Sequence, residues 1–492
     1  MQVKKFFLKL NILQNLSSLN FARFFLLLIA LCSFLESCSE SIESKKFDSF
    51  LKEPCMILNY QQNNTIEGDY FIIDMISLSD SIIELNLPKD FYLNQFNLSS
   101  WTIGWGKGTP YYDAGCENIR EIKIISENKI TLGQLLRGNG FPKEGQRVVF
   151  WNRNPSGFTN EIKTPVINPN IWHDFVGESI SFGSVVYDSL IKKWVMVVTE
   201  CDSPKMQIYA AISDDLIHWK AANNGKAILT PNDFKFCTWT GKNQNNSNFQ
   251  TPFVTDILYH NHQWFLFMNG YDKNGKKHVG LAVSKQSVLG PYNIVTTPVL
   301  SPGQKGRWDE NSCFYAKVAK YRNGFVMFYD GRNEAGYECV GMATSADLVH
   351  WKKNKMNPVI DQHLGWRSNE KTSEPNYIEI KKDTIILMVA GRKQFNLRSW
   401  NIFETSNLNM DKSGNVDDAQ LGIFLSTNGG KTFSPHKYNP VFINDYSNLY
   451  ENEHMGGNFV LINNQNMQFI FYQAKSSYQK LKYNIMLRQK KK

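Results

Sequence analysis

Acidic side chains recur in this chain just ahead of short apolar runs that have the composition of β-strands. Asp309 and Glu310 precede one run, Glu374 precedes another, and Glu178 and Glu453 precede two more. If these runs converge on one axis, the carboxylates share a cavity, and crowding of like charges raises the pKa of some and leaves others ionised. General acid–base catalysis requires such a pair. The alternative for each residue is a carboxylate on the surface, or one that hydrogen-bonds between two sheets.

Five other side chains are candidates for holding a ligand beside these carboxylates. Arg332 and Arg392 each end an apolar run in a Gly-Arg pair, and a guanidinium group binds a carboxylate or sulfate through two parallel hydrogen bonds. A salt bridge between sheets is the alternative for both. His454 is a possible acid or ligand contact, Trp308 lies directly before the first acidic pair, and Gln250 stands ahead of a strand-like run. We therefore expect these five residues to contact the substrate.

The strands that must position these residues are short and form hairpins. Residues 313–319 and 325–329 are strand-like runs joined by a polar turn that ends in Asn-Gly, which is a hairpin signal. A third strand is expected at residues 338–344, and a turn at residues 345–351 leads into a fourth. Four short antiparallel strands in about 60 residues are typical of one blade of a β-propeller.

The turn at residues 345–351, Ser-Ala-Asp-Leu-Val-His-Trp, has an earlier copy at residues 213–219, Ser-Asp-Asp-Leu-Ile-His-Trp. Five of the seven positions match, and the copies lie 132 residues apart, which is two units of 66. A unit with three strand-like runs lies between them. The hairpins ahead of each copy also repeat, which makes two coincidental turns the weaker interpretation.

Five such units follow Trp172. Their approximate bounds are residues 172–231, 232–302, 303–360, a fourth unit from 366 with a polar insertion at 393–420, and a fifth at 451–490. The pattern predicts an all-β protein, namely a five-bladed β-propeller with an additional N-terminal β-rich region. The fifth unit is one strand short. We therefore expect a strand from the N-terminal region, with residues 148–151 as the candidate, to close the ring.

These features resemble the five-bladed β-propeller glycoside hydrolases, which include glycoside hydrolase families 32, 43, 62, 117 and 130. The resemblance rests on the five units, the Asp-Leu-x-His-Trp turns, the Trp-Asp start at Trp308 and the strand Phe-Val-Met-Phe-Tyr-Asp-Gly-Arg at residues 325–332. It covers roughly residues 172–488. It implies a hydrolase that cleaves a glycosidic bond of a polysaccharide or oligosaccharide with carboxylates at the propeller centre.

Family 43 places an Asp base, an Asp modulator and a Glu acid at the starts of the first three inner strands, and this chain departs from that pattern. Gly183 and Ser184 stand near the first position, Gln250 and Thr251 near the second, and Tyr315 near the third. The acid and base roles therefore go to carboxylates that are present: Asp309, Glu374, Glu178, Glu310 and Glu453. A non-catalytic glycan-binding propeller is the alternative that these departures leave open.

A sialidase or lyase is a third and weaker interpretation. Sialidases carry several Asp-box turns, whereas this chain has one imperfect copy at residues 426–433, with Asn428 in place of Asp. The scattered cysteines include no CxxC pair, which argues against a zinc site. We expect no cofactor, although a structural Ca²⁺ ion in the central channel is compatible with the carboxylates.

The net charge and the aromatic content indicate which classes of ligand the protein binds. The net charge is +9, but no compact basic patch is interleaved with aromatics, so we do not expect nucleic acid to bind. A basic surface favours an anionic polysaccharide, and a solvated lysine-rich surface is the more common alternative. The chain holds 12 Trp, 21 Tyr and 33 Phe. Aromatic rings stack on the faces of sugars, so a carbohydrate substrate is expected, but packing between blades also consumes aromatics.

Residues 1–38 have the features of an export signal. Four basic residues precede an apolar run at 24–31, which is too short to span a membrane and has the length of a signal-peptide core. The sequence Leu-Glu-Ser-Cys that ends at Cys38 resembles a bacterial lipobox. We expect an outer-membrane or cell-surface lipoprotein, with plain secretion or an uncleaved anchor as alternatives. The expected segments are the signal at 1–38, a tether at 39–53, the N-terminal β-rich region at 54–165 and the propeller at 166–492.

The anchor is testable at one residue. If Cys38 carries a lipid, metabolic labelling with a clickable fatty acid will mark the wild-type protein and leave Cys38→Ala unlabelled, because the thiol is the attachment point. Equal labelling of both proteins would rule the anchor out.

Overall fold

The computed structural model describes only part of the chain. The described residues are 70–79, 82–87, 101–106, 116–117, 122–132, 147–152, 162, 164–177, 179–201, 203, 206–240, 252–361, 372–396, 415–435, 442, 450–451, 454–476 and 482–491. Within these ranges every regular element is a β-strand or a short 3-10 helix, and none is an α-helix. The prediction of an all-β protein is therefore confirmed. Cys38, with the rest of the export signal and the tether, lies outside the described residues.

The N-terminal β-rich region forms a seven-stranded sheet of its own, with strand order β4-β3-β7-β1-β2-β6-β5. Its strands are β1 (Tyr70–Ser79), β2 (Ile82–Asn86), β3 (Trp101–Gly106), β4 (Cys116–Glu117), β5 (Ile122–Ser126), β6 (Lys129–Leu132) and β7 (Arg147–Asn152). All paired strands of this sheet are antiparallel.

The remaining strands form five blades of antiparallel strands. Blade 1 holds β8 (Ser179–Asp188), β9 (Lys193–Cys201), β10 (Ile208–Ser213) and β11 (Lys220–Ala221). Blade 2 holds β12 (Phe253–His260), β13 (Gln263–Tyr271), β14 (Lys277–Ser284) and β15 (Asn293–Ile294). Blade 3 holds β16 (Ser312–Tyr321), β17 (Gly324–Arg332), β18 (Glu338–Ser345) and β19 (Trp351–Lys353). Blade 4 holds β20 (Thr372–Lys381), β21 (Thr384–Asn396), β22 (Asn415–Ser426) and β23 (Ser434–Pro435). Blade 5 holds β24 (His454–Asn464), β25 (Met467–Ser476) and β26 (Lys482–Lys491).

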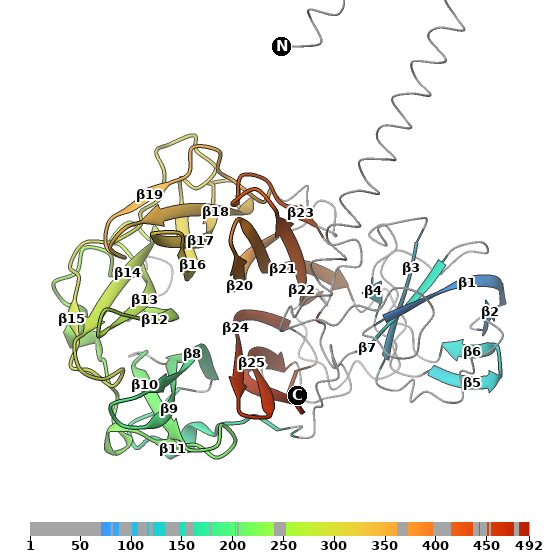
Figure 1. The fold of residues 1–492 in the computed structure, drawn as a ribbon, viewed down its shortest axis with the longest axis horizontal. Helices are drawn as coiled ribbons and strands as arrows, with labels where there is room; N and C mark the ends of the chain where they lie inside the picture. Colours follow the sequence, from blue (N-terminus) through green and yellow to red (C-terminus); the bar gives the residue numbers. More distant parts are fainter. Residues whose placement is uncertain are drawn as a thin grey trace, which may run out of the picture. The chain divides into compact units, whose positions relative to one another are not determined.

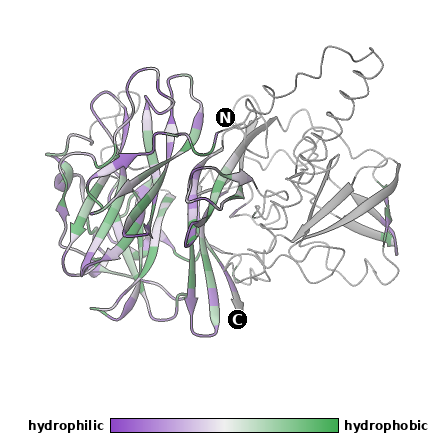
Figure 2. Ribbon diagram, turned by 45° about the horizontal axis from the view of Figure 1, so that its top comes forward, coloured by the Kyte–Doolittle hydropathy of each residue, from purple (hydrophilic) through white to green (hydrophobic). Residues whose placement is uncertain are grey.

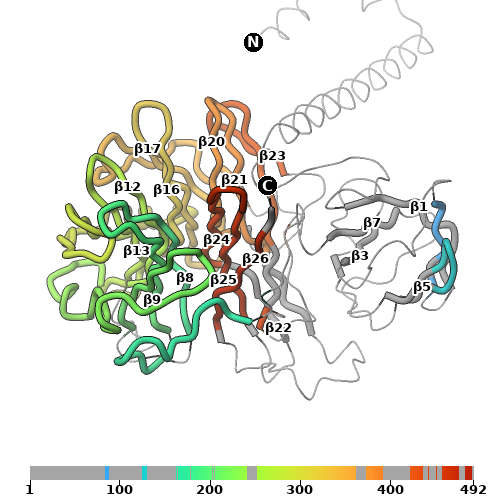
Figure 3. The backbone as a smooth tube through the Cα atoms, turned by 60° about the horizontal axis from the view of Figure 1, so that its bottom comes forward, coloured from blue at the N-terminus to red at the C-terminus, as the bar shows by residue number. Residues whose placement is uncertain are grey.

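The first strand of each blade lies nearest the axis of a ring (Figure 1). β8 contacts β12, β12 contacts β16, β16 contacts β20, β20 contacts β24, and β24 returns to β8. Figure 3 follows the same path, with the strands of blade 5 between those of blade 4 and β8. This arrangement is the predicted five-bladed β-propeller.

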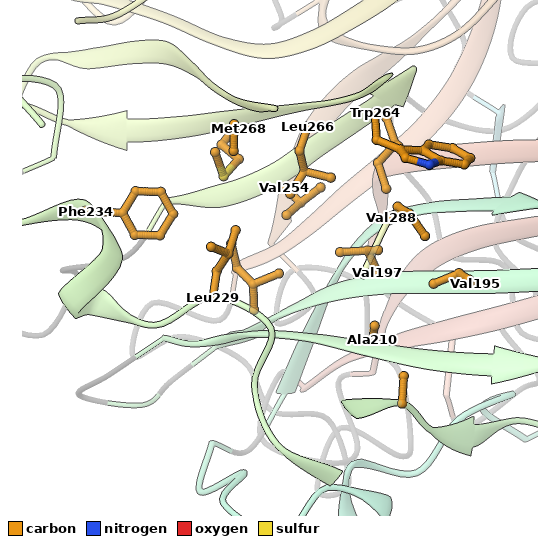
Figure 4. Close-up of a cluster of buried hydrophobic side chains, with 14 of the residues drawn as sticks. Val195, Val197, Ala210, Leu229, Phe234, Val254, Trp264, Leu266, Met268 and Val288 are labelled. Carbon is orange, nitrogen blue, oxygen red and sulfur yellow. The ribbon is translucent and has the colours of Figure 1, made fainter. Parts of the chain in front are cut away.

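Apolar side chains between neighbouring blades hold the ring together. One cluster takes Val195 and Val197 from β9, Val254 from β12, and Leu266 and Met268 from β13 (Figure 4). All five are at most 1% exposed. Figure 2 shows the corresponding pattern, with hydrophobic stretches along the strands and hydrophilic residues in the connections. Because burying one such side chain contributes about 1.5–3 kcal/mol, the contacts between blades supply much of the stability.

Blade 5 closes the ring against blade 1 through the backbone of Phe182. The Phe182 N–H donates to Gln473 Oε1 at 2.8 Å, and the Phe182 carbonyl accepts a hydrogen bond from Asn458 Nδ2. Beyond these strands, the Val166 N–H donates to the carbonyl of Ile485 in β26 at 2.8 Å. The segment just ahead of blade 1 therefore lies against the last strand of blade 5.

The strand expected to close the ring, at residues 148–151, does not do so. These residues belong to β7, which lies between β3 and β1 in the N-terminal sheet and pairs with both. A strand with both edges paired has no row of backbone groups left for another blade. That part of the prediction is wrong, and Val166 makes the observed backbone contact instead.

The repeated turn phrase forms the same structure twice. Asp215 Oδ1 accepts the N–H groups two and three residues later at 2.9 and 2.8 Å, and Asp347 does the same at 3.0 and 2.8 Å. The rings of His218 and His350 lie 2.6 and 2.7 Å from the second carboxylate oxygen. Although partial burial opposes the shift, the hydrogen bonds from these histidines and the backbone hold the pKa of both Asp carboxyls well below the usual range. Both histidines are therefore turn residues.

The closing contact predicts a stability effect at Gln473. Gln473→Ala leaves the buried N–H of Phe182 without its acceptor, which should lower the free energy of unfolding by about 1–3 kcal/mol in urea denaturation. Gln468→Ala changes a half-buried residue of the same strand that bonds only to the Asn463 side chain across the hairpin, and it should stay within about 0.5 kcal/mol of the wild type. Equal stability of the two variants would show that this latch does not hold the ring.

Candidate functional site

Every inner strand carries a β-bulge near its start, where its register with the second strand shifts. We call this edge of the ring, at which the inner strands begin, the rim. The bulges contain Gly183, Thr255, Tyr315, Glu374 and Gly457. Three of these have positive φ: 48° at Tyr315, 54° at Glu374 and 89° at Gly457. Bulges re-aim side chains and are frequent next to active sites, so the rim is the candidate site.

The seventh residue of the second strand is polar in four of the five blades. In blades 1 and 2 this residue is Thr199 or Asn269, whose side-chain oxygens accept the N–H groups of Val254 and Tyr315 at 3.1 and 3.0 Å. Gln473 is the seventh residue in blade 5 and makes the bond to blade 1 described above. The same position thus ties several blades to the next one.

In blade 4 the bond to the next inner strand comes from Glu374 and not from the second strand. The seventh residue of β21 is Ala390, which has no polar side chain. The Glu374 side chain, on the inner strand of the same blade, accepts the N–H of Gly457 in blade 5 through Oε2 at 3.2 Å. The residue is 1% exposed. Glu374, predicted as a catalytic carboxylate, is thus buried at the start of an inner strand and makes a bond between blades. Its catalytic role stays a prediction.

A second polar contact between inner strands joins Asp256 of blade 2 to Lys317 of blade 3. The Lys317 Nζ lies 3.6 Å from Asp256 Oδ1, and Asp256 Oδ2 accepts the N–H of Val318 at 2.8 Å. Burial lowers the pKa of the Lys317 ammonium, against the opposing effect of the Asp256 charge. Lys317 directly follows the bulge that contains Tyr315, so this pair adds a charged contact between two inner strands.

Asp309 lies within blade 3, against its sheet. Its Oδ2 accepts hydrogen bonds from Lys353 Nζ at 2.5 Å and from the Tyr329 hydroxyl at 3.2 Å, and the residue is 2% exposed. Burial, and then the neighbouring Cys313 and Asp309, raise the pKa of the Tyr329 hydroxyl well above its usual range, so this hydroxyl stays protonated and donates. This environment is that of an ion pair inside a blade.

The same arrangement recurs in blade 5. Glu451 Oε2 accepts a hydrogen bond from the Tyr472 hydroxyl, and Glu451 Oε1 lies 3.5 Å from Arg488 Nη2. Glu451 and Arg488 are both 0% exposed. An acidic residue ahead of an inner strand therefore pairs with a tyrosine and a base of its own blade. This repeat explains the acidic pattern in the sequence without a shared cavity, at least for Asp309 and Glu451.

The two neighbours of Asp309 also have structural partners. The indole of Trp308 packs on Gly331 and Gly341, where an added Cβ would meet it at 2.2 and 2.8 Å. Glu310 accepts the N–H groups of Gly306 and Glu334 with its two carboxylate oxygens, the latter at 3.2 Å. These hydrogen bonds lower the pKa of the Glu310 carboxyl, the one from Gly306 most. Trp308 and Glu310 thus fix the loop that leads into β16.

Arg332 lies at the rim, where β17 ends. Its Nη1 is 3.7 Å from Glu338 Oε1, and its side chain is 38% exposed. Glu338 in turn accepts a hydrogen bond from the Ser373 hydroxyl in β20 at 3.2 Å. Arg332 therefore belongs to the junction of blades 3 and 4, where Ser373 directly precedes Glu374 in the sequence.

The roles predicted for five of the site residues stay predictions. Glu178, Glu453 and Gln250 lie outside the described residues. Arg392 in β21 and His454 in β24 are placed at the rim by their backbones. The side chains of these five residues lie outside the described part of the structure, so their roles stay predictions.

Sequence reasoning missed two carboxylates of the blade 3–4 junction, Asp330 and Glu338. Asp330 is the seventh residue of β17 and is 0% exposed, and Glu338 is 4% exposed. The signal was available, because Asp-Gly-Arg at the end of this strand aligns with Ala-Gly-Arg in blade 4 and Asn-Gly-Tyr in blade 2. Comparing the three strands in register would have identified Asp330 as the polar residue of the repeat.

The comparisons with known proteins give structural likenesses alone. No family model matches the sequence, and no curated protein matches it. Among solved structures, the chain is similar to BT0996 in a complex with RGII, with 18% identity over 65% of this chain and 90% of that protein and a TM-score of 0.46. It is also similar to a thermostable family-43 glycoside hydrolase, with 13% identity over 64% of this chain and 91% of that protein and a TM-score of 0.42. A third similar structure is Zg3597, a family 117 glycoside hydrolase of Zobellia galactanivorans, with 14% identity over 68% of this chain and 88% of that protein and a TM-score of 0.41.

The described residues offer neither a metal cluster nor a membrane helix. In this part of the chain, no group of three or more His, Cys, Asp or Glu side chains is arranged to hold a metal ion. No helix within it is long and apolar enough to cross a membrane. Ca²⁺ in the central channel stays a prediction.

The ion pair of blade 3 predicts a stability effect rather than a catalytic one. Lys353→Met keeps the aliphatic stem but leaves the buried Asp309 charge without its partner, which should lower the free energy of unfolding by up to about 3–5 kcal/mol. Lys352→Met removes one charge from the exposed neighbour on the same strand. Urea denaturation compares the two variants. If Lys353→Met were as stable as Lys352→Met, the pair would not support the blade.

Proposed function

We propose that this protein is a glycoside hydrolase whose reaction takes place at the rim, with Glu374 as one of its catalytic carboxylates. The observation that carries the proposal is the position of Glu374: a carboxylate on a positive-φ bulge at the start of an inner strand. Asp309 and Glu310 are engaged in blade 3 and its loop, so they do not enter this proposal.

Backbone strain supports the choice of this residue. A non-glycine residue with positive φ costs roughly 1–3 kcal/mol, and such residues cluster at active sites and ligand clamps. Glu374 at 54° and Tyr315 at 48° hold this conformation in neighbouring inner strands. The Pro375 that follows Glu374 fixes the chain just after the bulge. The carboxylate is thus held in one place by the fold, which acid–base chemistry needs.

Glycosidic hydrolysis requires a second carboxylate. The separation is about 5–5.5 Å in retaining enzymes and about 6.5–9.5 Å in inverting ones. Asp330 and Glu338 of blade 3 are the described candidates, because the Ser373 hydroxyl, one residue before Glu374, donates to Glu338. Glu178 and Glu453 are the candidates from blades 1 and 5. We favour inversion or an exo-activity, on the resemblance to the propeller hydrolases.

One observation favours the alternative of a non-catalytic glycan-binding propeller. Among the five bulge positions Gly183, Thr255, Tyr315, Glu374 and Gly457, one holds a carboxylate. A binding module needs rim contacts but no proton donor. In either case the ligand is a poly- or oligosaccharide, and the proposed location is the bacterial cell surface, through a lipid on Cys38.

Glu374→Gln tests the catalytic role. The amide keeps the shape of the side chain and an acceptor for the Gly457 N–H, but it neither gives nor takes the proton. Turnover of the glycan that the wild type cleaves in a hydrolysis screen should fall roughly 10²–10⁴-fold, with a melting curve close to that of the wild type. Glu379→Gln is the matched control, because it makes the same change further along β20.

Two outcomes would contradict the proposal. Full activity of Glu374→Gln would remove Glu374 from the mechanism and make Glu178 and Glu453 the next pair to change. A wild-type protein that binds glycans but releases no product from any of them would identify the binding module.

A further inference from the structure

Three side chains that the proposed function does not use are of the types found in a hydrolytic triad: Ser301, His278 and Asp272. His278 is the second residue of β14, which begins at the rim because Lys277 is in register with Ser312, the first residue of β16. The Ser301 Oγ lies 3.2 Å from His278 Nδ1, and the Asp272 Oδ2 lies 3.3 Å from His278 Nε2. One imidazole thus has a hydroxyl at one ring nitrogen and a carboxylate at the other.

The Asp272 carboxylate is held by the turn between β13 and β14. Its Oδ1 accepts the N–H groups of Asn274 and Lys276 at 2.8 and 2.9 Å, and its Oδ2 faces His278. The His278 Nε2 is buried with no better-aligned acceptor within the described residues, and contacts of this kind often tighten only when a substrate binds. A carboxylate beside one ring nitrogen favours the tautomer with the proton on that nitrogen. Nδ1 is then free to accept a proton.

Ser301 presents its hydroxyl to His278 from an exposed loop. The Val279 N–H donates to the Leu300 carbonyl at 2.9 Å, and the Leu300 N–H donates to the Val279 carbonyl at 3.2 Å. These bonds fix the chain neighbours of His278 and Ser301 next to one another. Ser301 is exposed, whereas the His278 side chain is 12% exposed. A substrate can therefore reach the hydroxyl while the imidazole is held behind it.

The surroundings of His278 favour its neutral form. Burial lowers the pKa of the imidazole, and the Asp272 carboxylate opposes this shift. The ammonium charges of Lys276 and Lys353 lower the pKa further. A neutral imidazole is the form that takes a proton from a serine hydroxyl, so His278 has the protonation state of a general base.

Acyl transfer also needs hydrogen-bond donors for the oxyanion of the tetrahedral intermediate. The loop directly after Ser301 carries two candidates, the N–H groups of Gln304 and Lys305. Both residues are exposed, and neither N–H donates to another group within the described residues. Gly306 follows, with open space where a Cβ would stand. This side of the loop is therefore accessible to a ligand.

We propose that Ser301, His278 and Asp272 form a second active site, which hydrolyses acyl esters. The Ser301 Oγ attacks the acyl carbon while its proton passes to His278 Nδ1. The bond from the acyl carbon to the alcohol oxygen then breaks, and His278 returns the proton to that oxygen. Water attacks the acyl-serine with the same proton transfers, which releases the acid and restores Ser301. Asp272 acts through His278, as a positioning residue.

This chemistry is independent of the proposed glycosidase reaction, because it uses neither Glu374 nor a glycosidic bond. The substrate class is a small acyl ester of an alcohol. If the rim binds a glycan, as proposed above, an acyl group on a sugar hydroxyl is the ester that reaches Ser301.

Two reagents test the site on the whole protein: 4-nitrophenyl acetate and a fluorophosphonate probe. The wild type should hydrolyse the ester, and peptide mass spectrometry should place the phosphonyl group on Ser301. Ser301→Ala should lose both signals. His278→Gln should lower both rates roughly 10²–10⁴-fold, because the hydroxyl loses its base. Ser189→Ala makes the same change at an exposed serine of the β8–β9 hairpin and should keep the wild-type rates.

Asp272→Asn tests the positioning role. Asn keeps an oxygen for the two N–H groups of the turn but removes the negative charge that raises the pKa of His278. His278 accepts a proton only above its pKa, so the labelling rate of the wild type should rise with pH through that pKa. In Asp272→Asn the rate should fall and this rise should move to lower pH. An unchanged rate and pH profile would contradict the triad.

Equal ester hydrolysis by the wild type and Ser301→Ala, including none by either, would overturn the proposal. So would a phosphonyl adduct on Ser301 that forms as fast in His278→Gln as in the wild type. Glu374→Gln should keep the full rate of ester hydrolysis. A protein that cleaves the ester through Ser301 but cleaves no glycan would refute the proposed glycosidase and leave this inference intact.

Discussion

The ring depends on its closure where the last blade meets the first, to which the backbone of Phe182 contributes two hydrogen bonds. A propeller blade is stable only when both of its faces are covered, so an open ring would expose two apolar faces. The side chains of Gln473 and Asn458 bond the N–H and the carbonyl of Phe182, and an apolar cluster shared by blades 1 and 5 surrounds this contact. Closure therefore fixes the relative positions of all five inner strands, and with them the rim.

The bonds between blades give Glu374 a structural task beside the catalytic role proposed for it. In blades 1, 2 and 5 a neutral side chain of the second strand holds the next inner strand. Blade 4 has Ala390 at that position, and the carboxylate of Glu374 makes the bond from the inner strand instead. A group that both ties blades together and sits on a strained bulge is rigid. A catalytic side chain needs this kind of rigidity, because it must be held close to its productive geometry.

Local patterns were predictable from the sequence, and long-range partners were not. The turns of Asp215 and Asp347 are set by hydrogen bonds within a few residues, so their repeat identified the blades. The partner of Asp309 was not predictable, because Lys353 lies 44 residues away on the outer strand of the same blade. No spacing rule links the two. Glu374 was a candidate because it adjoins an inner strand, and its role stays a prediction, whereas Asp330 was missed because its register with the other blades was not compared.

The most direct test of the catalytic role of Glu374 is a crystal structure of Glu374→Gln with an oligosaccharide of the substrate bound. We predict the glycosidic oxygen or the adjacent anomeric carbon at the rim, with the residue 374 side chain or its bridging water within about 2.6–3.2 Å. An oligosaccharide bound at the opposite edge of the ring, or on the outer strands with residue 374 still buried behind the backbone of Gly457, would contradict this role.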